Sequence, residues 1–365
     1  MSQPPLIDRY PGVAMLPRVE LCTLPTPLEP GNALLSATDA GALGNLWIKR
    51  DDRTSQLYGG NKTRKLEFLL GGARAEERRA VITFGAYGSN HALATAVHAT
   101  ALGIEPHVVL SPQEPGPFAA RTLRAHAGLG TRLHLAGDWD GKRAAVLAKR
   151  ELVARDGIEP CIIPMGGSSA LGALGYVNAA FELLAQVAEA GAPMPAAVYA
   201  AAGTFGTAIG LAIGFAAAGA PVRVVGVRVT PDEVGSETVS HRLAEDTIAL
   251  LRALDDMFPA LAYSDLHFTL RHDWFEPGYG IVTPETTEAV EVARGAGLTL
   301  ETTYTGKALA ALLDDAHCGL LRGGDVVFWD TYHSGAMPPA GDDALLPPEL
   351  RAYVQRCDQL FGRRE

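Results

Sequence analysis

Short runs of β-branched and apolar residues alternate with longer Ala- and Leu-rich segments along most of the chain. The short runs have the length and composition of buried strands, whereas the longer segments repeat apolar residues with a helical period. Alternation of this kind is typical of parallel sheets that carry helices on their faces. The pattern therefore predicts an α/β protein with mainly parallel sheets.

The same pattern places the individual elements. Strands are expected at residues 46–49, 80–84, 106–110, 132–135, 161–163, 196–200, 222–229 and 325–329. Helices are expected at residues 63–75, 89–102, 117–127, 141–155, 169–189, 206–218, 284–295, 306–316 and 347–361. Repeated proline removes backbone donors, so the segment up to residue 31 is expected to be an irregular arm laid over a domain.

Composition narrows the class of protein. With 365 residues, of which 47% are hydrophobic and 20% charged, the chain can fill two cores and is expected to form two domains. A net charge of -10 without a Lys/Arg block argues against a nucleic-acid partner. No segment reads as a signal peptide or membrane span. The 4 scattered cysteines indicate reduced thiols, a cytoplasmic protein and no metal site.

Three cations crowd the start of the helix expected at 63–75, directly after a Gly-Gly turn and Asn61, which can cap this helix. Lys62, Arg64 and Lys65 lie at the positive end of the helix dipole. Each exposed positive charge there destabilises the helix by about 0.3–1 kcal/mol. An anion bound nearby would explain them, and neighbouring positive charge would also lower a lysine pKa and make the amine a nucleophile.

A second interpretation of these cations needs no ligand. Three solvated basic side chains with Glu67 as an intrahelical partner would produce the same pattern. Charge alone does not choose between the two interpretations, nor among the three cations.

A strand-to-helix turn, GAYGSNHALATAVHA, follows the strand at 80–84 and places Ser89, Asn90 and His91 at a helix N-terminus. Backbone amides at such a position attract a carboxylate or phosphate. The alternative is that Ser89 only caps the helix.

A second turn, AAAGTFGTAIG, joins the strand at 196–200 to the next helix. It lacks the spacing of a dinucleotide loop and the lysine of a P-loop, so a monophosphate site is the favoured interpretation and a plain glycine-rich turn the alternative. Its residues are Gly203, Thr204, Phe205, Gly206 and Thr207.

Six segments in this order resemble the D-cysteine desulfhydrase and 1-aminocyclopropane-1-carboxylate deaminase family: GGNKTRKLE, GSNH, PMGGSSALGALGY, GTFGT, PGYG and TYTGKAL. The resemblance covers about residues 45–335, and GGNKTRKLE is its specific signature. It implies the tryptophan synthase β-like fold of pyridoxal phosphate enzymes, with two three-layer α/β domains. Residues 1–60 and 167–365 would form the large cofactor-binding domain, residues 61–166 the small inserted domain, and a homodimer is usual.

The resemblance also implies roles for the matching residues. Lys62 would hold pyridoxal 5'-phosphate as an imine, and a small amino acid would be the substrate. The implied catalytic residues are Lys62, Tyr279, Tyr304 and Ser89. The implied cofactor-binding residues are Lys62, Lys65, Asn90, Gly203, Thr204, Phe205, Gly206, Thr207, Tyr304 and Thr305. The implied substrate-binding residues are Ser89, Asn90, His91, Tyr279 and Thr331.

Three positions favour the desulfhydrase branch of that family. Thr305 stands where the deaminases carry a carboxylate beside the pyridine nitrogen, and His91 and Thr331 also match the desulfhydrases. A hydroxyl there leaves the nitrogen unprotonated, which suits β-elimination. The predicted reaction is α,β-elimination from D-cysteine or an analogue such as cysteate, giving an oxo acid, ammonia and the leaving group. The alternatives are 1-aminocyclopropane-1-carboxylate deaminase and a catalytically silent ligand-binding homologue.

One segment departs from the family pattern, and this departure leaves the identity of the leaving group open. The handedness of the substrate depends on which face of the ring each base occupies, so the sequence determines neither the handedness nor the α-proton base. Where desulfhydrases typically read H-T-G-G, bulky or titratable side chains are expected near the ring edge and substrate. The residues are Asp330, Thr331, Tyr332, His333, Ser334 and Gly335. Tyr87 is likewise expected to alter the pocket.

Overall fold

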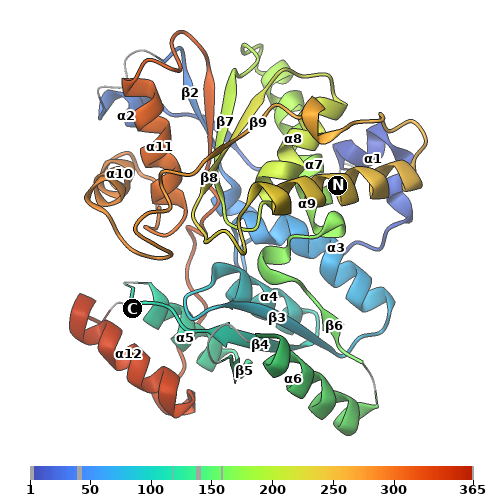
Figure 1. Ribbon diagram of the computed structural model, residues 1–365, viewed down its shortest axis with the longest axis vertical. Coiled ribbons are helices and arrows are strands. Elements are labelled where there is room, and N and C mark those ends of the chain that lie inside the picture. The colour runs from blue at the N-terminus through green and yellow to red at the C-terminus, as the bar shows by residue number, and fades with distance from the viewer. Residues whose placement is uncertain (1–3, 39–42, 117, 137–140, 158, 364–365) are drawn as a thin grey trace.

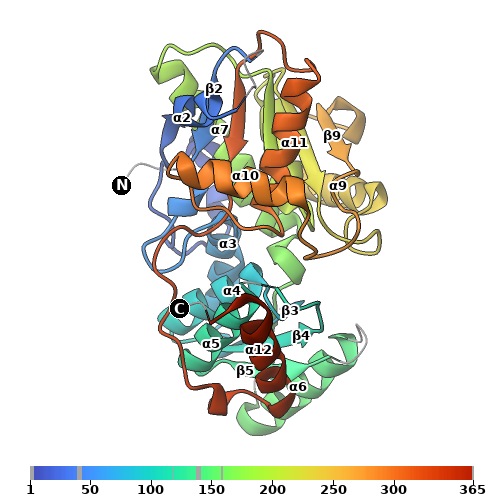
Figure 2. The same ribbon diagram turned by 90° about the vertical axis from the view of Figure 1, so that its left-hand side faces the viewer.

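The computed structural model describes residues 4–38, 43–116, 118–136, 141–157 and 159–363. Its strands form a six-stranded and a four-stranded sheet. Figures 1 and 2 show the two sheets one above the other, with α3 (Asn61–Ala75) at the level between them. All strand pairs but one are parallel, so the predicted α/β class with mainly parallel sheets is confirmed.

The larger sheet is covered on both faces. Its strands, in spatial order, are β1 (Leu28–Pro30), β2 (Leu46–Lys49), β10 (Val326–Trp329), β7 (Ala197–Ala202), β8 (Arg223–Arg228) and β9 (Phe268–Arg271). Alternate residues of β7 enter two different cores, because successive strand side chains point to opposite faces. One core holds α7 (Ala170–Glu189), α8 (Gly206–Ala217) and α9 (Glu237–Leu254). The other holds α2 (Asn32–Ser36), α10 (Pro284–Gly295) and α11 (Thr305–His317).

The smaller sheet has the order β5 (Arg132–Leu135), β4 (Glu105–Ser111), β3 (Ala80–Ala86) and β6 (Cys161–Ile162). Helices α4 (Asn90–Ala101) and α5 (Ala119–Gly128) pack on one face, and α6 (Gly141–Asp156) packs on the other. The last helix, α12 (Pro348–Phe361), packs against α5, as Figure 2 shows. The division into residues 1–60 with 167–365 and residues 61–166 stays a prediction, and α12 lies with the smaller sheet.

The structure extends the predicted elements at several places. Helix α9 was not expected, although its buried Leu243, Ala244, Thr247, Ile248 and Leu251 follow a helical spacing. The edge strands β1 and β9 were missed because they are short and only partly buried. The opening arm is not wholly irregular: α1 (Pro5–Arg9) and a 3-10 turn at Pro11–Met15 insert Leu6 and Val13 into the larger core. Residue 117, the predicted start of α5, lies outside the described residues.

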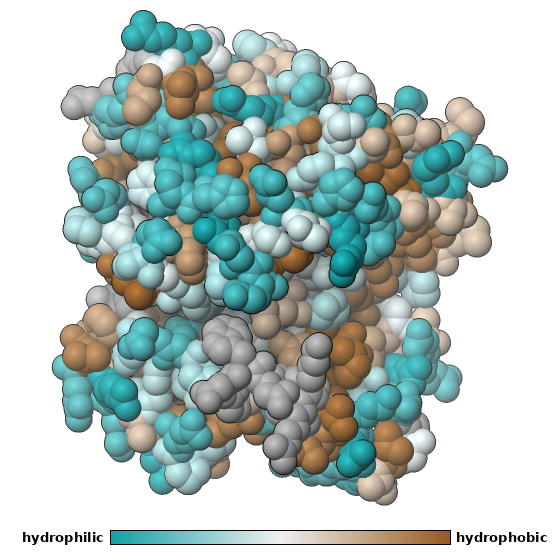
Figure 3. Space-filling model, in the orientation of Figure 1, coloured by the Kyte–Doolittle hydropathy of each residue, from teal (hydrophilic) through white to brown (hydrophobic). Residues whose placement is uncertain are grey.

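Helix α7 is long and apolar enough, by length and composition alone, to cross a membrane. In the fold, 67% of its most apolar part is buried, and it packs against α8, α3 and α9. On the face drawn in Figure 3, hydrophobic residues are scattered among hydrophilic ones and form no continuous band. The composition of α7 is therefore that of a helix at the centre of a core.

Candidate active site

A cavity of about 880 Å³, counted with its opening to solvent, is lined by residues from both sheet regions. Its walls come from α3, the β3–α4 turn, the β7–α8 turn, the start of α11 and the segment after β10. Every residue to which the family resemblance assigned a catalytic, cofactor-binding or substrate-binding role lines this cavity. These residues are Lys62, Lys65, Ser89, Asn90, His91, Gly203, Thr204, Phe205, Gly206, Thr207, Tyr279, Tyr304, Thr305 and Thr331.

Lys62 presents its amine to the cavity. Its Nζ donates a hydrogen bond to Asn61 Oδ1 at 2.7 Å, and Asn61 Nδ2 donates to Thr207 Oγ1 at 2.9 Å. Burial lowers the pKa of the Lys62 amine to about 8, so part of it is neutral near pH 7. Asn61 therefore does not cap α3 as expected. Gly60, with φ 92°, takes the N-cap position, and Asn61 links the lysine to the β7–α8 turn.

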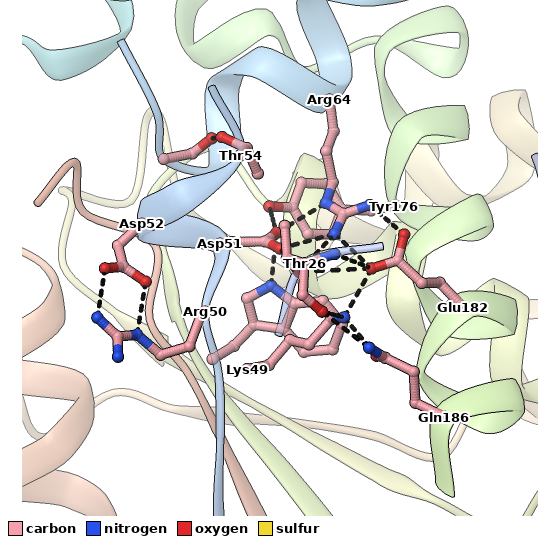
Figure 4. Close-up of polar contacts among 12 residues, drawn as sticks. Thr26, Lys49, Arg50, Asp51, Asp52, Thr54, Arg64, Tyr176, Glu182 and Gln186 are labelled. Carbon is pink, nitrogen blue, oxygen red and sulfur yellow. Dashed lines mark hydrogen bonds and ion pairs between the residues drawn. The ribbon is translucent and has the colours of Figure 1, made fainter. Parts of the chain in front are cut away.

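Arg64 lies away from the cavity, in a buried network of ion pairs (Figure 4). Its Nη2 lies 2.7 Å from Asp51 Oδ1 and 2.9 Å from Glu182 Oε1. Glu67 bonds to Arg18 and to backbone N–H groups near residue 21, and not to the cations of its own helix. The interpretation as three solvated cations with Glu67 as partner is therefore wrong.

Lys65 is buried beside the β7–α8 turn, and its Nζ donates to Gly166 O at 3.1 Å and Ser168 Oγ at 3.3 Å. Burial, with the Lys62 charge, lowers the pKa of Lys65 well below its ordinary value. Among the described residues, no carboxylate lies within 4.0 Å of this amine. A buried ammonium without a negatively charged partner is costly, so the place suits an anion.

The β7–α8 turn has the shape of a narrow cradle. Phe205 is in the left-handed region at φ 61°, and Gly206 N–H donates to Ser168 Oγ at 3.1 Å. A Cβ on Gly206 would stand 2.6 Å from Ser168 Oγ and 2.8 Å from Lys65 Nζ. Only glycine fits this contact, and the N–H groups at the start of α8 lie at the same place. The turn and Lys65 together fit a phosphate group.

The β3–α4 turn serves both interpretations that the sequence left open. Ser89 does cap α4, since its Oγ accepts from Ala92 N at 3.3 Å, and it also lines the cavity with Asn90. Burial and the charges of Lys62 and Lys65 lower the pKa of His91, so its imidazole is neutral. A helix N-terminus with a neutral imidazole and two lysines nearby is suited to a carboxylate.

Two phenols and a buried carboxylate form the opposite wall. Tyr279 Oη and Tyr304 Oη lie 2.7 Å apart. Sequence reasoning missed Glu301, which accepts N–H bonds from Thr303, Tyr304 and Thr305 at 2.7–2.9 Å. The Thr305 hydroxyl donates toward Glu301 Oε1 at 3.3 Å. The signal for Glu301 was a lone acid in the otherwise uncharged stretch before the TYTGK motif.

The segment after β10 contributes less to the cavity than expected, because only Thr331 and Tyr332 line it. His333 Nδ1 accepts from Gly59 N at 2.9 Å, and Ser334 Oγ donates to Asp52. Burial raises the pKa of Asp330 well above its ordinary value, with the Asp52 charge as a second cause.

Tyr87 also turns away from the cavity, so its expected effect on the pocket is wrong. Its hydroxyl lies 3.2 Å from Glu349 Oε1 of α12, and its ring packs against Tyr353. The expectation failed because a position beside a turn does not determine which side of the sheet the side chain faces.

Comparison with known proteins identifies the family. Residues 19–331 match the family described as "Pyridoxal-phosphate dependent enzyme". The chain is 37% identical over 354 residues to nocardicin C-9' epimerase of Nocardia uniformis subsp. tsuyamanensis, covering 93% of this chain and 99% of that protein. It is 37% identical over 309 residues to D-cysteine desulfhydrase of Salmonella typhi, covering 82% of this chain and 88% of that protein.

Two solved structures are also similar. A structure of an ACC deaminase homologue, 27% identical, has a TM-score of 0.75 and covers 98% of this chain and 100% of that one. The processed form of threonine deaminase isoform 2 from Solanum lycopersicum, 19% identical, has a TM-score of 0.58 and covers 99% of this chain and 90% of that one, which supports the fold alone. The family resemblance seen in the motifs is confirmed. The chain belongs to the pyridoxal-phosphate dependent enzymes, and its cofactor is pyridoxal 5'-phosphate.

Proposed function

We propose that this enzyme is a lyase that catalyses α,β-elimination from a small β-substituted amino acid, D-cysteine or an analogue such as cysteate. The products are an oxo acid, ammonia and the leaving group. One observation carries the proposal: a buried lysine amine with a pKa near 8 shares a cavity with a hydrogen-bonded pair of phenols. A base and a proton donor are the two groups that this elimination requires.

The residues present fit the cofactor. The turn at residues 203–207 and Lys65 would hold the phosphate, Lys62 would hold the cofactor through its amine, and Asn90 would bond the 3'-oxygen attached to the ring. Bound there, pyridoxal phosphate supplies an electron sink for negative charge at the substrate α-carbon. Thr305 would face the pyridine nitrogen. Because its hydroxyl donates toward Glu301, it offers that nitrogen no proton, which favours elimination over the opening of a cyclopropane ring.

The protein's own residues bind the substrate and move its protons. Ser89 and Asn90, at the N-terminus of α4, bind the substrate carboxylate, and neutral His91 and Thr331 complete that side. The neutral fraction of Lys62 accepts the α-proton. Tyr279, bonded to Tyr304, donates a proton to the leaving group.

A substrate screen tests this proposal. Purified enzyme is given D- and L-cysteine, cysteate and β-chloroalanine, and oxo acid release is measured. We expect turnover of at least one β-substituted amino acid, and loss of turnover and of the cofactor's visible band in Lys62→Ala. Neither loss is expected in the control Lys149→Ala, which changes a half-buried lysine of α6 outside the cavity. A Lys62→Ala protein that retains band and turnover would contradict the proposal.

The alternatives give different results in the same screen. A deaminase would release 2-oxobutyrate from 1-aminocyclopropane-1-carboxylate. A catalytically silent homologue would bind the cofactor but release no oxo acid from any β-substituted alanine.

Epimerisation is a second candidate function, favoured by the similarity that spans 99% of the nocardicin C-9' epimerase. Inversion at an α-carbon begins with the same proton removal as elimination, and Lys62 could perform it. An epimerase would exchange the α-proton of a supplied amino acid with D₂O and produce the opposite enantiomer without oxo acid. Chiral chromatography of the reaction mixture separates the two functions.

We also propose a cytoplasmic homodimer. The unpaired thiols of Cys22, Cys161, Cys318 and Cys357 suit a reducing compartment. Sedimentation equilibrium at several protein concentrations would distinguish a dimer from a monomer.

A further inference from the structure

Tyr332 stands where the main cavity meets a second one. The second cavity, of about 410 Å³ with its opening to solvent, has Gln113 and Phe118 in its wall. Tyr332 lines both cavities, although only 5% of this residue is exposed to solvent. A substrate side chain that leaves the main cavity in this direction would pass the Tyr332 phenol.

An arginine outside the lining of both cavities donates a hydrogen bond to this phenol. Arg121 of α5 donates from Nη2 to Tyr332 Oη at 2.9 Å, and its guanidinium lies 5.6 Å from the Phe118 ring centre. The Nε of Arg121 is buried and finds no hydrogen-bond partner in the described part of the chain. Arg124, one turn further along α5, is instead paired with two carboxylates. Arg121 forms no ion pair with any described residue.

The direction of this hydrogen bond determines what the phenol can do. Because the guanidinium donates to Tyr332 Oη, the phenol hydrogen must point elsewhere, and no described residue accepts it. The charged groups that face the two cavities are Lys62, Lys65 and Glu301, with Arg121 behind Tyr332. Glu301, the only acid among the described lining residues, is bonded to three backbone N–H groups. The environment of the phenol therefore favours an acceptor with negative charge.

We propose that Tyr332, held by Arg121, binds an anionic group at the end of the substrate's side chain, so that the enzyme selects amino acids with a side-chain carboxylate or sulfonate. Tyr332 touches the substrate, and Arg121 is a positioning residue that acts through it. The inference rests on the proposed function only in taking an amino acid as the substrate. It assigns the segment after β10 a role in specificity.

Equilibrium binding of two nearly isosteric amino acids tests the inference. Aspartate and asparagine, each as both enantiomers, have side chains of nearly the same shape that differ in charge, and alanine lacks the side-chain group. Calorimetric titration of the holoenzyme with all three measures how much the side-chain negative charge contributes to affinity. We expect at least one enantiomer of aspartate to bind about tenfold more tightly than asparagine. In Tyr332→Phe and Arg121→Met the ratio of aspartate to asparagine affinity should fall toward one, while the affinity for alanine stays unchanged. Arg121→Lys should retain part of the preference for aspartate.

Equal affinity for aspartate and asparagine in the unaltered enzyme would overturn the inference, as would a ratio that survives both substitutions. Loss of alanine binding in both variants, without restoration by Arg121→Lys, would indicate a structural role and overturn it as well. Oxo acid release plays no part in this measurement. The enzyme can therefore show the aspartate preference without catalysing the proposed elimination, and it can catalyse the elimination without showing that preference.

Discussion

The hydroxyl oxygens of Tyr279 and Tyr304 lie 2.7 Å apart in the wall of the cavity, and the Tyr304 ring centre is 6.0 Å from Lys62 Nζ. Burial raises the pKa of Tyr279 to about 12 and raises that of Tyr304 well above its ordinary value. Both phenols are therefore protonated near neutral pH. One phenol donates to the other, and the second retains a hydrogen for the substrate.

Removal of the Tyr279 hydroxyl should slow turnover without loss of the cofactor. We expect Tyr279→Phe to lower kcat by about 100-fold or more, because a positioned proton donor contributes that much to a reaction. The visible band should keep its intensity. Steady-state kinetics give kcat, and Tyr10→Phe, which removes a core hydroxyl outside the cavity, is the matched control. A Tyr279→Phe enzyme with unchanged kcat would remove Tyr279 from the mechanism.

Lys62 should react as an amine at lower pH than an exposed lysine. A lysine is nucleophilic only when deprotonated, so a pKa lowered to about 8 moves the rise in reactivity down from the usual value of about 10.4. At pH 7 roughly one amine in ten is then neutral. Acetylation of the cofactor-free protein by acetic anhydride, followed by mass spectrometry from pH 6 to 10, measures this profile. Lys149, whose side chain is 41% exposed, provides the internal reference. A midpoint for Lys62 near 10 would contradict the prediction.

A methyl group at Gly206 should weaken cofactor binding. The added Cβ would stand 2.6 Å from Ser168 Oγ and 2.8 Å from Lys65 Nζ, so one side of the phosphate cradle must shift. We expect the Kd of pyridoxal phosphate for the Gly206→Ala apoprotein to rise by about tenfold or more. Absorption titration measures it. Gly295→Ala, where a Cβ meets nothing within 4 Å, should leave the Kd unchanged, and equal Kd values for the two variants would exclude the cradle.

The buried network around Arg64 should be a major source of stability. In Arg64→Met, Asp51 would lose its charged partner, and Glu182 would keep Lys49 as its charged partner among the described residues, so burial of these carboxylates becomes costly. We expect the free energy of unfolding to fall by about 3–5 kcal/mol. Urea denaturation followed by far-UV circular dichroism measures it.

The exposed ion pair of Arg53 with Glu29 is the control for this change. Arg53→Met should cost about 1 kcal/mol or less, because solvent screens the pair. Similar losses in the two variants would show that the buried network is no stronger than a surface pair.

Much of the fold could be predicted because apolar periodicity is strong in buried elements. The expected strands at 46–49 and 132–135 coincide with β2 and β5. Edge strands β1 and β9 escaped because half-exposed strands lack a continuous apolar run. The side chains of residues 330–335 could not be placed, since an irregular segment has no period from which their directions follow.

The sequence by itself determined the α/β class and placed the turns at Ser89 and Gly203, and its family resemblance predicted a reactive lysine at residue 62. The spacing of the three cations along α3 also separates Arg64 from the two lysines, which their charge alone did not do. At about 100° per residue, Lys62 and Lys65 lie about 60° apart around α3, whereas Arg64 lies about 160° from Lys62 and about 100° from Lys65. Only the tertiary structure decided which face meets the cavity. Packing of α3 against α7 brings Glu182 to Arg64 and buries the pair, and Lys62 and Lys65 line the cavity with the β7–α8 turn.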